Sequence, residues 1–206
     1  MSARIPNTFR QLADIRAASD AEVIERSGTD PEVFAVIFDR HADEIYRYAA
    51  RRLGQDAAPD VVSDVFLAAF RNRDRYRSDS ADARPWLFGI TTKVISQHIR
   101  AAGRRARLFA SVPLPRPAEL RVDEISDRIA AQRLQPRMLG VLAELSAADR
   151  ELVLLVAWAE LSYEQVGEAL AVPIGTVRSR LHRVRAKVRR SIGPVSALFD
   201  LEPDRG

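Results

Sequence analysis

The sequence predicts an all-α protein with two small helical domains joined by a flexible linker, the C-terminal domain being a helix-turn-helix. Apolar residues recur at intervals of three and four, the spacing of amphipathic helices, and no stretch of useful length alternates as a strand does. Prolines at positions 113, 115 and 117 interrupt this pattern. Because closely spaced prolines favour extended chain, they mark the boundary between the domains.

These features divide the chain into five segments. An N-terminal lead with room for one short helix covers residues 1–30, and the first domain covers residues 31–105. The linker runs over residues 106–135, the second domain over 136–192 and a C-terminal tail over 193–206. With 47% hydrophobic and 29% charged residues, the chain of 206 residues has the composition of a folded globular protein rather than a disordered one.

The first domain is predicted to contain three helices. The first follows the start signal Asp30-Pro31 and stops at Gly54, the second starts near Pro59, and the third runs from about Arg84 to Arg100. The apolar sides of these helices should face a common core; they comprise Phe34, Ile37, Phe38, Ile45, Tyr48, Ala49, Val61, Val62, Val65, Phe66, Ala69, Phe70, Trp86, Leu87, Ile90, Val94 and Ile99.

The second domain is also predicted to be helical. A helical pattern over 123–134 precedes it, and Ser146 can cap a helix over 147–159. Its apolar start consists of Met138, Leu139, Leu142 and Leu145.

Two helix starts separated by a tight turn follow within residues 161–190. Ser162 and Gln165 have the spacing of a capping box, in which each side chain accepts the backbone N–H of the other residue. Pro173 ends the short helix after them and suits the entrance of the next one. The next helix carries a stripe of apolar residues at steps of four, three and four: Val177, Leu181, Val184 and Val188.

The other face of this last helix is basic. No acidic residue occurs between Glu168 and Asp200 to neutralise it. Its cations are Arg178, Arg180, Arg183, Arg185, Lys187, Arg189 and Arg190. Such a face suits phosphates and guanine edges, so the motif favours DNA reading over a solvated helix face or a chance match. A second acid-free run, from Ala83 to Ala118, lies far from it in the chain.

Composition excludes several other classes of site. The absence of cysteine rules out disulfides and thiolate metal sites, and His41, His98 and His182 lack metal-ligand spacing, so we expect no metal and no cofactor. There is no phosphate-cradling glycine loop and no pairing of a nucleophile with a base, which argues against an enzyme. No apolar run has membrane-spanning length and the start lacks a signal-type core, so we expect a cytoplasmic protein without a membrane partner.

Three motifs, in this order, resemble the RNA polymerase sigma-70 family, extracytoplasmic-function (ECF) type. They are D-A-A-P-D-V-V-S-D-V-F-L-A-A-F at 56–70, R-P-W-L-F-G-I at 84–90 and L-S-Y-E-Q-V-G-E-A-L-A-V-P-I-G-T-V-R-S-R-L at 161–181. The resemblance covers residues 31–105 and 136–192. It implies a non-enzymatic sigma factor whose partners are core RNA polymerase, promoter DNA and an anti-sigma factor. An autonomous helix-turn-helix regulator that needs no polymerase is the alternative.

The resemblance also implies roles for individual residues of the first domain. This domain corresponds to sigma domain 2, which binds the polymerase clamp and the unpaired strand of the −10-type element. The polymerase-binding positions are Asp60, Ser63 and Asp64. The loop that holds an extruded base includes Ser78, Asp79 and Ser80, and the DNA-facing positions of the adjacent helix are Lys93, Gln97 and Arg100.

The second domain corresponds to sigma domain 4, which reads the −35-type duplex element. The DNA-binding positions are Thr176, Arg178, Ser179, Arg180, His182 and Arg183. Two departures from the family pattern bear on structure: Thr91-Thr92-Lys93 replaces a frequent Ala-Arg-Asn, and Ala171 replaces a turn glycine. The turn at Ala171 must therefore avoid a left-handed backbone or carry its steric cost. Trp86 is expected to pack in the core, with base stacking by Trp86 or Phe88 as the alternative.

Overall fold

The computed structural model describes residues 15, 17–76, 81–108, 140 and 144–192. Within these ranges all regular structure is helical, which confirms the all-α class. The chain divides into two compact units, Met1–Leu120 (unit 1) and Arg121–Gly206 (unit 2). In the described residues no helix is both long enough and apolar enough to cross a membrane.

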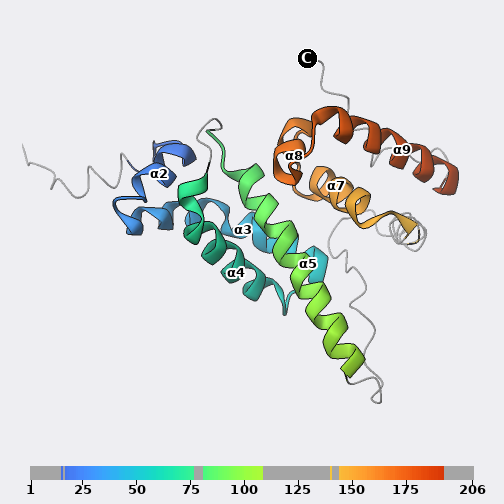
Figure 1. The fold of residues 1–206 in the computed structure, drawn as a ribbon, viewed down its shortest axis with the longest axis horizontal. Helices are drawn as coiled ribbons and strands as arrows, with labels where there is room; N and C mark the ends of the chain where they lie inside the picture. Colours follow the sequence, from blue (N-terminus) through green and yellow to red (C-terminus); the bar gives the residue numbers. More distant parts are fainter. Residues whose placement is uncertain (1–14, 16, 77–80, 109–139, 141–143, 193–206) are drawn as a thin grey trace, which may run out of the picture. The chain divides into compact units, whose positions relative to one another are not determined.

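Unit 1 is built on three helices that pack against one another, α3 (Ala35–Leu53), α4 (Ala58–Arg71) and α5 (Arg84–Leu108) (Figure 1). A 3-10 helix, η1 (Pro31–Phe34), leads into α3, and the Asp30 carboxylate accepts the backbone N–H of Glu32 at its start. Gly54, with φ of 92°, ends α3. A second 3-10 helix, η2 (Arg73–Arg75), follows α4. The predicted helix starts are confirmed, whereas α5 extends beyond the predicted end.

Aromatic rings fill the centre of unit 1. Tyr48 of α3 and Phe88 of α5 are 1% exposed and meet edge to face, with ring centroids 5.3 Å apart. Phe88 therefore belongs to the core and does not offer a face to a base. Two predicted core residues are corrected by the structure: Phe38 is 44% exposed and Ile99 49% exposed, because both lie at the edge of their helix's apolar side.

The lead contributes a helix to unit 1. This helix, α2 (Asp20–Arg26), begins with a capping box formed by Ser19 and Glu22. Val23 is fully buried and Ile24 is 3% exposed, so α2 packs on the unit by its apolar side. The short helix expected in the lead is thus a part of the folded body.

Unit 2 contains α7 (Ala147–Trp158), α8 (Tyr163–Leu170) and α9 (Ile174–Ile192) (Figure 1). Ser146 caps α7, and the Ser162–Gln165 capping box starts α8, both as predicted. The predicted stripe of α9 is 0–6% exposed at all four positions, which are Val177, Leu181, Val184 and Val188. The pattern over 123–134 and the residues Met138, Leu139 and Leu142 lie outside the described residues.

The turn between α8 and α9 uses a left-handed residue. Ala171 has φ of 53° and ψ of 46°, so the turn carries the steric cost that a glycine would have avoided. The N–H of Val172 donates to the carbonyl of Gly167 at 2.9 Å and closes the turn. A Cβ at Gly167 would stand 2.9 Å from the Val172 carbonyl oxygen, so this glycine allows the close approach.

Candidate nucleic-acid interface

The first half of α9 presents a polar and basic face opposite its buried stripe. Arg178, Ser179, His182 and Arg183 are exposed, whereas Thr176 and Arg180 are partly buried. The Ser179 hydroxyl donates to the carbonyl of Thr176 at 3.1 Å. The six predicted positions thus share one end of the helix, beside the turn.

Arg178 has one partner within the described part of unit 2. Its guanidinium lies 3.6 Å from the carboxylate of Glu164 in the first turn of α8. The two side chains are 59% and 51% exposed, and exposed ion pairs of this kind contribute about 0–1 kcal/mol. A phosphate or a guanine edge can therefore displace Glu164 at little cost.

In the second half of α9, two basic residues join the helix to other parts of the unit. Arg185 donates to the hydroxyl of Tyr163 at 2.6 Å, which joins α9 to the start of α8. Lys187 donates to the carbonyl of Glu144 at 2.9 Å and lies 3.2 Å from the carboxylate of the same residue. Of the basic residues in this half, Arg185 and Lys187 thus hold the helices together, whereas Arg189 and Arg190 are exposed.

In unit 1 the predicted DNA-facing residues lie on one exposed side of α5. Lys93, Gln97 and Arg100 are all exposed, and steps of four and three place them on one face of the helix. The opposite side carries Val94 and Ile95, which are 7% and 0% exposed. The structure thus brings the three residues together at the surface.

The Thr91-Thr92 departure lies inside the unit. Thr91 is fully buried and donates its hydroxyl to the carbonyl of Leu87 at 2.8 Å; Thr92 donates to Gly89 at 3.0 Å. These hydroxyls are satisfied within α5, so of the three departing residues Lys93 alone faces outward.

The base-holding loop falls partly outside the structure's range: Ser78, Asp79 and Ser80 are not among the described residues. The flanks of the loop are described. The hydroxyl of Tyr76 donates to the carbonyl of Asp82 at 3.4 Å, and its ring meets Trp86 edge to face at 5.1 Å. Trp86 is partly buried and packs on Tyr76, so it lies at the margin of the core rather than inside it as expected.

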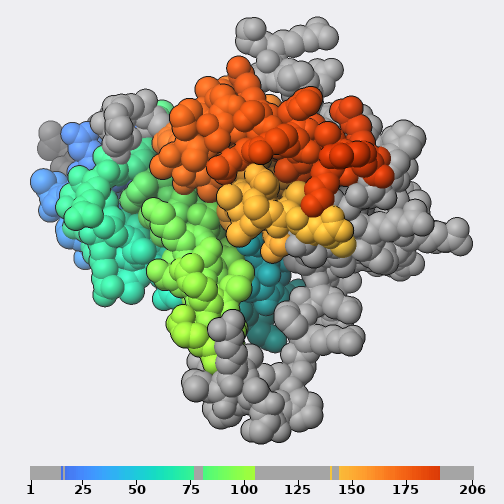
Figure 2. Space-filling model, turned by 45° about the vertical axis from the view of Figure 1, so that its right-hand side comes forward, coloured from blue at the N-terminus to red at the C-terminus, as the bar shows by residue number. Residues whose placement is uncertain are grey.

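The predicted polymerase-binding residues Asp60, Ser63 and Asp64 are exposed on one side of α4, whose surface adjoins that of α5 (Figure 2). Asp64 accepts a hydrogen bond from His98 of α5 at 2.9 Å. Leu67, 46% exposed, extends the same side of α4, and sequence reasoning missed it. The sequence did contain a signal for this: Leu67 comes three residues after Asp64, a spacing that places both on the same helix face, and it lies off the apolar stripe of α4.

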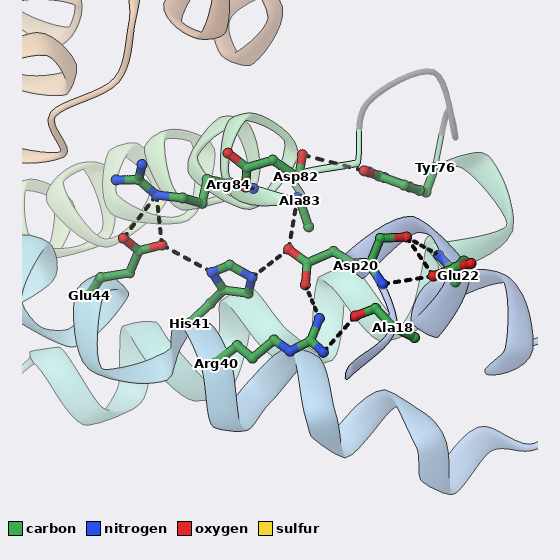
Figure 3. Close-up of polar contacts among 11 residues, drawn as sticks. Ala18, Asp20, Glu22, Arg40, His41, Glu44, Tyr76, Asp82, Ala83 and Arg84 are labelled. Carbon is green, nitrogen blue, oxygen red and sulfur yellow. Dashed lines mark hydrogen bonds and ion pairs between the residues drawn. The ribbon is translucent and has the colours of Figure 1, made fainter. Parts of the chain in front are cut away.

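A buried polar cluster joins three helices of unit 1, and sequence reasoning did not find it (Figure 3). Asp20 of α2 is 7% exposed and His41 of α3 is 8% exposed. The Asp20 carboxylate accepts from Arg40 at 2.6 Å, from His41 Nε2 at 2.8 Å and from the backbone N–H of Ala83 at 3.0 Å. The members of this Asp20 cluster are Asp20, Arg40, His41, Glu44, Ala83 and Arg84.

The rest of the cluster reaches α5 by a second path. His41 Nδ1 lies 3.1 Å from Glu44, whose carboxylate accepts from Arg84 at 3.1 Å. Burial alone lowers the pKa of His41, but its hydrogen bonds to Asp20 and Glu44 outweigh burial and raise that pKa to about 9. Burial raises the pKa of Asp20, yet the bonds from His41, Ala83 and Arg40 bring it down to about 2. The pair is ionised at neutral pH.

Histidines and carboxylates do not gather into a metal site within the described ranges. His41 and His98 bond to carboxylates of other helices, and His182 is exposed on α9. They act as packing or helix-face residues.

Comparison with known families finds two matches that correspond to the two units. The model of sigma-70 region 2 matches residues 37–105, and the model of sigma-70 region 4 matches residues 137–188. Asp20 lies outside both matches.

Similar whole proteins carry related names. The chain is 34% identical over 159 residues to the ECF RNA polymerase sigma factor SigE of Mycolicibacterium smegmatis, which covers 73% of this chain and 58% of that protein. It is also 27% identical over 186 residues to the ECF RNA polymerase sigma-E factor of Haemophilus influenzae. That alignment covers 86% of this chain and 97% of that protein.

Two solved structures have a similar fold. CnrH, in complex with the cytosolic domain of CnrY, matches with a TM-score of 0.56 at 22% identity, over 83% of this chain and 95% of that one. The sigma factor RpoE of Bartonella quintana, in complex with the anti-sigma factor NepR, matches with a TM-score of 0.55 at 23% identity, over 82% and 98%.

Proposed function

The chain belongs to the sigma-70 family as an ECF sigma factor that directs promoter recognition by RNA polymerase, and we propose how its two units divide this task. The resemblance predicted from the three motifs is confirmed, and the family is not enzymatic. Binding energy is therefore the whole of the mechanism. We propose that unit 2 reads a duplex element upstream while unit 1 binds core polymerase and holds an unpaired strand.

The observation that carries this division is the exposed basic face on each unit. On unit 2, the first half of α9 offers Arg178 and Arg183 beside the polar groups of Ser179 and His182. Guanidinium groups on the outer face of a helix can bond both a guanine edge and a phosphate, and the helix-turn-helix sets such a helix in the major groove. The brace between Arg185 and Tyr163 fixes the angle at which α9 is presented.

On unit 1, the face of α5 formed by Lys93, Gln97 and Arg100 tracks an unpaired strand. Two cations supply contacts to the phosphates, and an amide between them offers both a donor and an acceptor to a base edge. Unstacking a base costs a few kcal/mol, which these contacts offset. We propose that Ser78, Asp79 and Ser80 belong to the loop that receives the unstacked base.

Core polymerase binds the exposed side of α4. Asp60 and Ser63 offer an acid and a hydroxyl, and Leu67 adds apolar area to the same side. Such a mixed surface suits a partner that is basic at its rim and apolar at its centre. Asp64 joins it at the edge nearest α5, through His98.

An anti-sigma factor is the remaining partner. Each of the two similar solved structures is a complex, one with the cytosolic domain of CnrY and the other with the anti-sigma factor NepR. An inhibitor of this chain would cover the α4 side and so compete with core polymerase. Addition of core to the inhibited chain would then release the inhibitor, and an Asp60→Lys chain would lose both partners.

The test of the division is a gel shift on a promoter obtained by run-off selection, with and without core polymerase. We expect the chain to bind the promoter tightly and specifically only when core polymerase is present, since one small unit supplies few contacts by itself. Tight specific binding of the isolated chain would instead support an autonomous regulator. Asp60→Lys should abolish the shift with core polymerase, whereas Glu25→Lys, a charge reversal at another exposed acidic residue, on α2, should leave it unchanged.

A further inference from the structure

We propose that Asp20 is a positioning residue for promoter opening: its carboxylate joins α2, α3 and the entrance of α5, and so sets where unit 1 holds the unpaired strand. The inference rests on the role proposed above for α5. It assigns a function in DNA capture to the N-terminal lead, a segment outside the region that the family model matches.

One carboxylate serves three elements (Figure 3). Asp20 stands at the first position of α2, its Oδ1 accepts from Arg40 on α3, and its Oδ2 accepts from both His41 and the N–H of Ala83. Ala83 is fully buried and its carbonyl accepts the first backbone bond of α5, from Leu87. A buried N–H needs an acceptor, so the bond from Ala83 to Asp20 fixes the position of the first turn of α5 relative to α2 and α3.

The charges of the cluster make the geometry specific. His41 lies between two carboxylates, Asp20 at Nε2 and Glu44 at Nδ1. Ionised carboxylates only accept, so both ring nitrogens must donate and the imidazole is charged. An amide at position 20 would turn an NH₂ group toward groups that themselves donate. Asp20→Asn keeps the size of the side chain but cannot satisfy these bonds together.

Fixing Ala83 also fixes the neighbourhood of the base-holding loop. The next residue, Arg84, donates its N–H to the Asp82 side chain and pairs through its guanidinium with Glu44 of the same cluster. On the other flank, Tyr76 donates to the Asp82 carbonyl and packs on Trp86. Since α5 is a continuous helix, a shift of its entrance moves Lys93 and the residues after it.

The experiment uses the full chain with core polymerase on a promoter obtained by run-off selection. Permanganate reactivity of unpaired thymines measures opening, and competition against the wild-type chain measures core binding. Each variant is assayed on the duplex promoter and on the same promoter with a mismatched bubble. Asp20→Asn and Asp20→Ala are compared with Glu25→Gln, a change of an exposed carboxylate on the same helix, outside both the Asp20 cluster and the capping box.

We expect Asp20→Asn to lower opening of the duplex promoter at least ten-fold and to weaken protection of the bubble strand, with core binding changed less than two-fold. Glu25→Gln should match the wild type. Equal opening by Asp20→Asn and wild type would overturn the inference. Parallel loss of core binding and opening would also overturn it, because the residue would then only keep unit 1 folded.

The same assay separates this inference from the function on which it rests. If the wild-type holoenzyme fails to protect the bubble strand, or if Lys93→Ala leaves that protection unchanged, the proposed role of α5 is wrong whatever Asp20 does. If wild type protects the strand and Lys93→Ala weakens protection while Asp20→Asn does not, the positioning role alone is wrong.

Discussion

At the scale of single residues, the ionised pair of Asp20 and His41 shows how a buried charge is held. Each charge is expensive to bury alone, and each is satisfied here: Asp20 by groups of α3 and of the α5 entrance, and His41 by Asp20 and by Glu44 of its own helix. Removing one member leaves the rest uncompensated, so the pair acts as a unit. Its stabilisation depends on pH in a direction that follows from the two pKa values.

The pair predicts a decline in the stability of unit 1 at alkaline pH. The pKa of His41 rises from 6.5 to about 9 on folding, so its contribution is complete below pH 6.5 and is lost as pH rises toward 9. The pKa of Asp20 falls from 3.8 to about 2, so its contribution is complete above pH 3.8 and is lost as pH falls toward 2. Between pH 6.5 and 9 the free energy of unfolding should drop by on the order of 3 kcal/mol.

Urea unfolding across this pH range measures the decline. Trp86 fluorescence in a Trp158→Phe chain reports unit 1 alone, because the chain has 2 tryptophans, one in each unit. A His41→Gln chain should be less stable at pH 6 and should lack the decline. The same decline in His41→Gln as in the parent chain would show that another group titrates.

The left-handed backbone of Ala171 has a cost in stability that can be measured. A left-handed conformation costs a non-glycine residue about 1–2 kcal/mol. A glycine at the same position avoids this cost but loses about 0.5–1 kcal/mol more than alanine in chain entropy on folding. Ala171→Gly should therefore stabilise unit 2 by about 0.5–1 kcal/mol, read from Trp158 fluorescence in a Trp86→Phe chain. Ala169→Gly, inside α8, should destabilise it by a similar amount. If Ala171→Gly and Ala169→Gly both destabilise unit 2, the backbone of Ala171 is not strained.

At the scale of elements, local signals in the sequence predicted the helices well. The Ser162–Gln165 box, the proline at 173 and the four-residue stripe of α9 are short-range patterns, and a helix is decided over a few turns. The Asp20 cluster was not predicted, because its partners are 20 or more positions apart and only the packing of three helices brings them together. For the same reason the sequence did not predict which basic residues of α9 are exposed, because Arg185 and Lys187 bond to Tyr163 and Glu144, which are distant in the chain.

Because the turn packs closely against α8, we expect alanine substitutions at Gly167 and Gly175 to have different effects on the stability of unit 2. Gly167→Ala would place a Cβ 2.9 Å from the Val172 carbonyl oxygen, and overpacking of this kind costs about 1–3 kcal/mol. Gly175→Ala meets nothing within 4 Å and improves helix propensity in α9, so it should be neutral or stabilising by up to about 1 kcal/mol. Thermal unfolding of both chains decides the point. Similar melting temperatures for the two would contradict the close approach.

The two halves of α9 predict different effects on promoter binding. Arg183→Ala, or Arg178→Ala, should weaken recognition of the upstream element by about 1–3 kcal/mol if the side chain meets a base edge. Arg189→Ala removes an exposed arginine from the last turns of the same helix and should act weakly and equally on all promoters. Run-off transcription on promoters varied at the upstream element measures both. An unchanged ranking of promoters with Arg183→Ala would rule out a base contact there.

At the scale of the whole molecule, the chain is a pair of folded units that each present a basic face, with core polymerase as the body on which both act. Family membership gives the task, and the exposed faces of α5 and α9 give the proposed division of that task. Affinity and specificity then depend on both faces being engaged at once, so neither unit needs a high affinity of its own.

Run-off transcription with core polymerase over a randomised promoter library tests this division most directly. The wild-type chain should select two separate elements; Arg183→Ala should relax the preference at the upstream element alone, and Lys93→Ala at the downstream element alone. Selection of a single element, or relaxation of the same positions by both substitutions, would contradict the division of labour between the two units.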